Sequence, residues 1–333
     1  MGIAYATREN VASALAFNET ARLSSSIDRA CQYSSRSVEA LCHRVFYPTI
    51  DTRTFRHIDD HWFWLDDNEV ISITSITIDG TVIPAADYDL YPDTGPPYSY
   101  IDFPDGPVVS GDSSLILVGM YGFANDTVTA GSLETAISSA SATTIDVTDG
   151  SLIGVGDVLV IESERLQVTG RTWLTSAQTG TLPASKSAVT LTVTTGSAFH
   201  VDETLLIGAE RIIITDISGN DLMVKRAQDG SVLAAHTTAT IYTSRTLTVV
   251  RGVLGTTAAT HADASAITKQ EYPALVVALT IALACNQLMQ EAGAYSRDLG
   301  TGDARGPATG GGLDAIRRDT RAANGRQARM RTV

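Results

Sequence analysis

The middle of this chain repeats itself, and the order of the repeated segments restricts how the chain can fold. Residues 145–169 align without a gap on residues 191–215, with ten identical positions out of 25. Residues 220–243 align in the same way on residues 245–268, with eight identical positions out of 24. If the first pair holds the first half of a repeat unit and the second pair its second half, the order is first, first, second, second. Complete tandem repeats would instead alternate between first and second halves.

The simplest explanation of this order is one complete unit inserted into a loop of another. We predict an outer unit formed by residues 137–170 together with 245–268. Residues 187–243 would form the inner unit, and residues 171–186 would connect the outer unit to it. The ends of the inner unit must then lie close together, because insertion into a loop requires it. Closing the longer loop costs little free energy. A duplicated pair of hairpins without nesting is the alternative.

The N-terminal end of the chain has helical periodicity. A first helix is expected at about 8–22, with Thr7 as its cap. In residues 27–45 the apolar side chains recur at the spacing of one helix face. Ser25 followed by Asp28 is a capping signature for this second helix.

Helical periodicity returns near the C-terminus. A helix is expected from Pro273 to about Arg297, and its stretch 272–290 has no charged residue. Its polar residues favour a buried or subunit-interface helix over a membrane span, which needs about 20 strongly apolar residues. Residues 300–312 hold six glycines, which predicts a flexible hinge before a short helix at about 313–323. The hinge glycines are Gly300, Gly302, Gly310, Gly311 and Gly312.

Between the N-terminal helices and the repeats, the pattern changes to that of strands. Val70 to Ile78 followed by Asp79-Gly80 predicts a hairpin, because Asp-Gly favours a tight turn. We therefore predict an α+β fold with a helical core that carries a small β-hairpin element, plus an inserted all-β region built of two nested similar units. The expected domains are a core of 1–124 and 269–299, an insert of 125–268, and a C-terminal arm of 300–333.

Charge is distributed unevenly along the chain. The net charge is −13, but residues 297–333 carry eight Arg and four Asp and are therefore positive. Such a charge balance excludes a globally basic nucleic-acid coat. Because Arg binds carboxylates and phosphates through two hydrogen bonds, the arm is expected to dock on an acidic partner; a disordered solubilising end is the alternative. The predicted docking residues are Arg317, Arg318, Arg321, Arg326, Arg329 and Arg331.

Residues that suggest catalysis are better explained by structure. His57 and His61 have the spacing of helical metal ligands, but the zinc-protease glutamate is missing and their surroundings favour an extended segment. The acidic pairs Asp59-Asp60 and Asp66-Asp67 are typical of solvated turns. Trp62 and Trp64 are expected in the core.

No catalytic, metal or cofactor site is predicted elsewhere either. Several charged residues recur in both repeats, and an active site is rarely duplicated intact, so a packing or turn-stabilising role is expected for Glu164, Arg165, Glu210, Arg211, His236 and His261. The chain has three widely spaced cysteines and no phosphate-binding loop. We therefore expect that this protein is not an enzyme.

Five segments resemble the head–tail connector (adaptor) proteins of long-tailed bacteriophages. The resemblance as a whole spans roughly residues 5–123 and 270–298, somewhat over two-fifths of the chain, and it rests on patterns rather than catalytic signatures. The segments are Ser26–Pro48, Val70–Gly80, Tyr88–Tyr91, Val118–Phe123 and Tyr272–Met289.

This resemblance implies a structural virion protein of the phage neck, assembled in the host cytoplasm. It implies a homo-oligomeric ring, commonly of twelve copies, that docks through its C-terminal segment on the portal protein ring. The next neighbour would be a stopper or tail-completion protein, and double-stranded DNA would pass through the ring without sequence-specific binding or any membrane. The insert 125–268 departs from the family pattern.

In an alternative hypothesis, the insert carries the function of the protein. In this hypothesis residues 125–268 bind carbohydrate or another surface, and the helices serve oligomerisation only. A glycan array on the isolated insert separates the two hypotheses. A metal hydrolase that uses His57 and His61 is the third, and metal analysis of the purified protein tests it.

Overall fold

The computed structural model shows a chain made mostly of β-sheet, with 42% of residues in strands and 23% in helices. It describes residues 2–15, 21–56, 61–66, 68–104, 114–292 and 309–326. The expected helical core is therefore wrong. Three of the five hydrophobic clusters among the described residues lie between strands, because the alternating Val, Ile and Leu residues of the strands supply most of the buried apolar surface.

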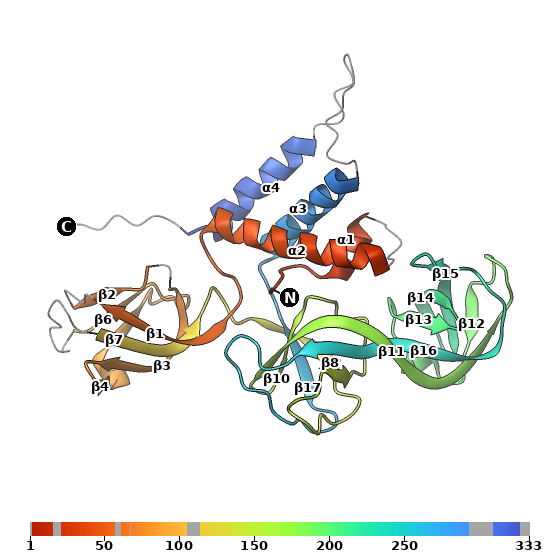
Figure 1. Cartoon of the computed structure of the whole chain (residues 1–333), viewed down its shortest axis with the longest axis horizontal. Coiled ribbons are helices and arrows are strands. Elements are labelled where there is room, and N and C mark those ends of the chain that lie inside the picture. Colours follow the sequence, from red (N-terminus) through yellow and green to blue (C-terminus); the bar gives the residue numbers. More distant parts are fainter. Residues whose placement is uncertain are drawn as a thin grey trace, which may run out of the picture.

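The helices form one layer above the sheets (Figure 1). Helix α2 packs against α3, and α4 packs against both. Their contact surface is formed by small and aliphatic residues such as Ile27, Ala30, Val38 and Leu279, which are fully buried. The helices are α1 (Arg8–Leu15), α2 (Ala21–Cys42), α3 (Ala274–Ala292) and α4 (Thr309–Asn324).

Two of the sequence predictions for helix starts have different outcomes. The cap at Thr7 is confirmed, because its Oγ1 accepts a hydrogen bond of 3.1 Å from the backbone N–H of Asn10. The capping role of Ser25 is wrong, because α2 already begins at Ala21 and Ser25 lies in its second turn.

A first β unit follows the helices and has its own core. One sheet has the order β1-β7-β3-β4, the other has the order β2-β6-β5, and both are antiparallel. The predicted turn is confirmed, since Asp79 and Gly80 have positive φ between β3 and β4. The strands are β1 (Thr49–Arg56), β2 (Trp62–Trp64), β3 (Val70–Ile78), β4 (Thr81–Ile83), β5 (Asp89–Tyr91), β6 (Tyr100–Asp102) and β7 (Ser114–Tyr121), with a 3-10 turn at Ala85–Asp87.

The repeated region forms a single ten-stranded sheet. Its two longest strands, β11 and β16, pair along their length and run through both ends of the region (Figure 1). The bounds are β8 (Thr127–Ser132), β9 (Thr144–Asp146), β10 (Val158–Ile161), β11 (Glu164–Leu182), β12 (Thr190–Thr192), β13 (Thr204–Ile207), β14 (Glu210–Ser218), β15 (Asp221–Gln228), β16 (His236–Val250) and β17 (Ala266–Gln270), with a 3-10 turn at Gly196–Ala198.

Within this sheet, two hydrophobic cores lie side by side along the ribbon of β11 and β16. One core draws its residues from Ala130–Val168 and Leu247–Ile267. The other draws its residues from Leu182–Ile241, a segment that lies between those two in the sequence. Equivalent strands pair in the same way, since β9 pairs with β16 at Thr144 and Thr248, while β12 pairs with β15 at Thr190 and Met223. We call these cores and their strands the outer unit and the inner unit.

The outer unit packs closely on the N-terminal segment, and the equivalent contact is absent from the described residues of the inner unit. Val155 is 1% exposed there, and its N–H and C=O bond to Glu9 and to the N–H of Arg8. A Cβ on Gly154 would lie 2.6 Å from Thr7 and Glu9, so this approach requires glycine. In the inner unit the equivalent of Gly154 is His200. The larger side chain is incompatible with the same contact, and Val201, the equivalent of Val155, is 43% exposed.

A second glycine fixes the first β unit on the outer unit. Gly255 has φ +79°, and a Cβ on it would lie 1.9 Å from the backbone oxygen of Ile50. We expect Gly255→Ala to lower the free energy of unfolding by about 2 kcal/mol, through backbone strain and the displacement of β1. Gly80→Ala is the matched control, because Gly80 also has positive φ but nothing lies within 4 Å of its Cβ position. Equal losses for the two variants in urea unfolding would contradict this account.

Candidate docking surfaces

The described part of the predicted docking arm, residues 309–326, is mainly the helix α4, which packs against α2 and α3. Leu313 and Ile316 of α4 pack on the cluster formed by α2 and α3, and the Thr320 hydroxyl donates to the backbone oxygen of Leu275. The end of the helix is also held, since the N–H of Arg326 donates to Cys42 O at 2.9 Å. Helix α4 is therefore presented in one fixed orientation.

The structure divides the predicted arginines into three groups. Arg318 and Arg321 are exposed on α4. Arg317 faces α2 and α3 and lies 3.3 Å from Asp314, while Arg326 is half-buried at the end of the helix. Arg329 and Arg331 lie outside the described residues.

The predicted hinge needs a correction at its end. Helix α4 begins at Thr309, so Gly310, Gly311 and Gly312 lie in its first turns rather than in a flexible connection. The packing of Leu313 and Ile316 on the neighbouring helices outweighs the low helix propensity of glycine. Gly300 and Gly302 lie outside the described residues.

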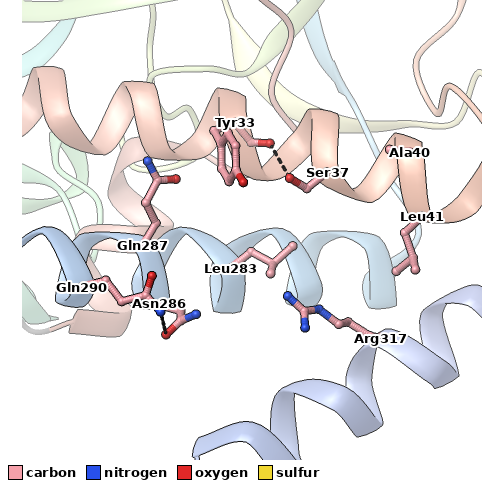
Figure 2. Close-up of a pocket in the computed structure, with 9 residues that line it drawn as sticks. All are labelled: Tyr33, Ser37, Ala40, Leu41, Leu283, Asn286, Gln287, Gln290 and Arg317. Carbon is pink, nitrogen blue, oxygen red and sulfur yellow. Dashed lines mark hydrogen bonds between the residues drawn. The ribbon is translucent and has the colours of Figure 1, made fainter. Parts of the chain in front are cut away.

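A cleft of about 770 Å³ opens between α2, α3 and α4 (Figure 2). Its wall on α3 carries the amides of Asn286, Gln287 and Gln290, and the guanidinium of Arg317 reaches it from α4. Tyr33 of α2 stands at the cleft and is 62% exposed. The cleft thus offers hydrogen-bonding groups and a cation to a protein segment, and it lies next to the exposed arginines of α4.

Helix α3 is long and apolar enough, by length and composition only, to cross a membrane. In the structure it packs against α1, α2 and α4, and 28% of its window Ala274–Glu291 is buried. The core helix of a soluble protein passes the same test of length and composition. The remaining surface of α3 includes the cleft wall and the 49% exposed Met289.

The charged residues that recur in the repeats form two equivalent buried clusters. In the outer unit, Glu164 accepts hydrogen bonds of 2.6 Å from Nε and Nη2 of Arg251 and one of 2.8 Å from His261. In the inner unit, Glu210 accepts bonds of 2.7 Å from Arg226 and one of 2.9 Å from His236. Each carboxylate also accepts hydrogen bonds from two backbone N–H groups. These belong to Gly252 and Ala259 in the outer unit and to Ala227 and Ala234 in the inner unit.

These clusters hold ionised carboxylates in the interior. Burial raises the pKa of Glu164, but the hydrogen bonds from Arg251, Ala259 and His261 outweigh it and lower the pKa to about 2. The pKa of Glu210 is lowered to about 2 by the equivalent groups against the same effect of burial. Both carboxylates are fully buried and accept hydrogen bonds from side chains and backbone of their own unit, which indicates a structural role. Arg165 and Arg211 lie outside both clusters; Arg165 bonds to Asn125, and Arg211 lies 3.6 Å from Asp229.

The other residues considered for chemistry do not form a site in the described ranges. His61 lies 3.2 Å from the backbone oxygen of Phe103, whereas His57, Asp59, Asp60 and Asp67 lie outside the described residues. No group of three metal-binding side chains occurs among the residues that are described. Cys31, Cys42 and Cys285 are buried, and burial raises the pKa of Cys31 to about 12.

One surface was not predicted from the sequence. Trp62 was expected in the core but is 56% exposed, because the buried residue of β2 is Phe63 between the two tryptophans. Cross-strand pairing places two rows on the outer face of the β2-β6-β5 sheet. These rows are Trp62, Asp102 and Asp89, and then Trp64, Tyr100 and Tyr91. We call them the aromatic–acidic face.

The strand register adds an observation about this face that the sequence alone does not contain. Asp89 lies directly opposite Asp102, and like charges at such positions destabilise a sheet. Local conflicts of this kind tend to mark functional sites. Comparison of the sequence and the structure with protein-family profiles, curated proteins and solved structures finds no match.

Proposed function

We propose that this protein is a structural ring protein of a phage neck, which joins the portal to the next neck or tail component. The observation that carries the proposal is helix α4. It exposes Arg318 and Arg321 from a rigid helical layer, in a chain whose net charge is −13. A positive helix on an otherwise acidic protein is suited to an acidic portal surface.

The charge of the rest of the chain supports a channel for DNA. Residues 57–164 contain 19 acidic residues and no Lys or Arg. A surface with this charge offers few cations that could bind DNA phosphates, so DNA would pass along it without adhering. The ring, the portal contact and the passage of DNA are parts of one proposal, to which the resemblance of the helical segments also contributes.

The portal contact gives a direct prediction. We expect Arg318→Glu/Arg321→Glu to weaken binding to the portal ring encoded beside this protein by about tenfold or more, since rows of like charge would face each other. Negative-stain electron microscopy of the mixture should show a new annular layer under the portal with the wild type and bare portals with the variant.

A matched control has the same change in charge elsewhere. Arg56 on β1 is exposed and Arg211 on β14 is partly exposed, and neither lies on the helical layer. Arg56→Glu/Arg211→Glu should therefore retain portal binding. Unchanged binding of the α4 variant, or equal loss in the control, would count against the docking role of α4. Bare portals with saturating wild-type protein would refute the proposed function.

A further inference from the structure

The aromatic–acidic face has the composition of a protein-binding surface. Trp and Tyr dominate the energetic centres of interfaces, and this face holds two of the three tryptophans of the chain. Asp89 and Asp102 of the face, and Asp93 beside it, form no ion pair in the described residues. The charge of Asp93 is the first cause that raises the pKa of Tyr91, followed by desolvation and by the charges of Asp89 and Asp102. No Lys or Arg is among the residues that form this face.

The inner unit carries a cleft of the opposite character. It has a volume of about 480 Å³ and is lined by Lys186, Lys225, Val189 and Met223, with no carboxylate among its lining residues. The chain has only three lysines, and the third, Lys269, lies 3.5 Å from Asp157. The two lysines without an ion-pair partner in the described residues thus line one cleft, around the 45% exposed Val189.

These two surfaces belong to opposite ends of the molecule. The first β unit, which carries β2 and β6, lies at one end of the long axis, and the inner unit with β12 and β15 lies at the other end (Figure 1). A contact between two different surfaces of the same chain is heterologous, and repetition of it generates a closed ring or an open filament. Complementary charge on opposite ends allows identical copies to repeat such a contact.

We propose that copies of this chain join head to tail, with the aromatic–acidic face of one copy seated on the lysine cleft of the next. Trp62 packs on Val189 and Met223, while Lys186 and Lys225 pair with Asp89, Asp93 and Asp102. This contact specifies which surfaces join neighbouring copies in the ring, and it therefore rests on the proposed function. Its residues are separate from the arginines of α4, so the two contacts are tested independently.

The test is self-association of the full chain without portal, measured by sedimentation velocity over a range of concentrations at low and high salt. The wild type is expected to associate, and salt is expected to weaken the association. Lys186→Glu/Lys225→Glu and Asp89→Lys/Asp93→Lys should each lower the association constant by about tenfold or more. An equimolar mixture of the two variants should restore association, because each then offers one reversed surface that matches the other.

The variants are chosen to remain folded. Lys186, Lys225, Asp89 and Asp93 are all exposed, and Asp89→Lys removes a like-charge pair with Asp102. The control Arg318→Glu/Arg321→Glu should self-associate like the wild type, although it loses the portal. A wild type that stays monomeric at every concentration, a mixture that fails to associate, or dissociation of the α4 control instead would each overturn the head-to-tail contact. Bare portals with an intact head-to-tail contact would refute only the proposed function.

Discussion

Replacing Glu164 with Gln is expected to lower the free energy of unfolding by about 3–5 kcal/mol, because it leaves the Arg251 guanidinium buried without its counter-ion. The carboxylate of Glu164 is fully buried, and the Arg251 side chain is 6% exposed. The effect should spread beyond the outer unit, because this unit also holds the N-terminal segment through Val155. Chemical unfolding and hydrogen exchange measure the total loss and its distribution along the chain.

The duplication supplies an internal comparison for this experiment. Glu210→Gln breaks the same cluster in the inner unit, which has its own hydrophobic core and lacks the contact with the N-terminal segment. We expect hydrogen exchange to accelerate within the inner unit while the helical layer stays protected. Glu162 is the matched control in the outer unit, since it lies 3.4 Å from His261 but is 65% exposed. A large loss of stability in Glu162→Gln, or none in Glu164→Gln, would contradict the role assigned to the cluster.

Acid is expected to destabilise the protein through these same two carboxylates. The pKa of Glu164 and of Glu210 is about 2 in the folded protein, below the ordinary value of 4.5. A group with a lowered pKa contributes stability above the unfolded pKa and loses this contribution as the pH falls through the folded one. Each carboxylate should therefore contribute about 3 kcal/mol above pH 4.5, lost progressively as the pH falls to about 2.

Unfolding midpoints in urea between pH 7 and pH 2 measure this loss. The wild type should fall steeply below pH 4.5, and the variant Glu164→Gln/Glu210→Gln, where it remains folded, should have a flatter profile. Because each residual carboxylate accounts for part of the slope, the single variants should lie between these two. Parallel profiles for all four proteins would show that other groups dominate the acid response.

The repeats predicted more of the structure than the helical periodicity did. Shared residues such as Glu164 and Glu210 identified equivalent positions, and the structure places them in equivalent clusters. Their partners lie in the other half of each repeat, up to 97 positions away for His261. The order of the halves favoured pairing the first with the last, but it left unnested hairpins as an alternative, and the hydrogen bonds that join the halves are visible only in the structure.

The balance between helix and sheet was misjudged for a physical reason. Apolar residues at helical spacing give a strong local signal, whereas the first β unit is built of short strands with long-range pairs such as β1 with β7. Trp62 was assigned to the core for a similar reason. In an alternating strand of three residues, either Phe63 or its two neighbours can face inward, and the pairing of β2 with β6 decides which.

The candidate site was predicted only in outline. The excess of arginine near the C-terminus directed attention to α4, but the exposure of Arg318 and the inward position of Arg317 depend on how the helix packs. The aromatic–acidic face combines residues from three strands, and the lysine cleft combines Lys186 with Lys225 across 39 positions. Such surfaces have no signature in one continuous segment.

The segments that supply the two cores also suggest an order of events during synthesis, because the segment of the inner core lies between the two segments of the outer core. Glu210 and Arg226 are separated by 16 positions, so the inner cluster closes soon after both residues are made. Glu164 must wait for Arg251, which follows 87 positions later. We expect the inner unit to fold by then and to bring its two ends together, which would shorten the chain that the outer unit must close and lower the entropic cost of closing it. In this order of folding the inner unit would form its part of the ribbon of β11 and β16 first, and the outer unit would be completed last by the residues that follow β16.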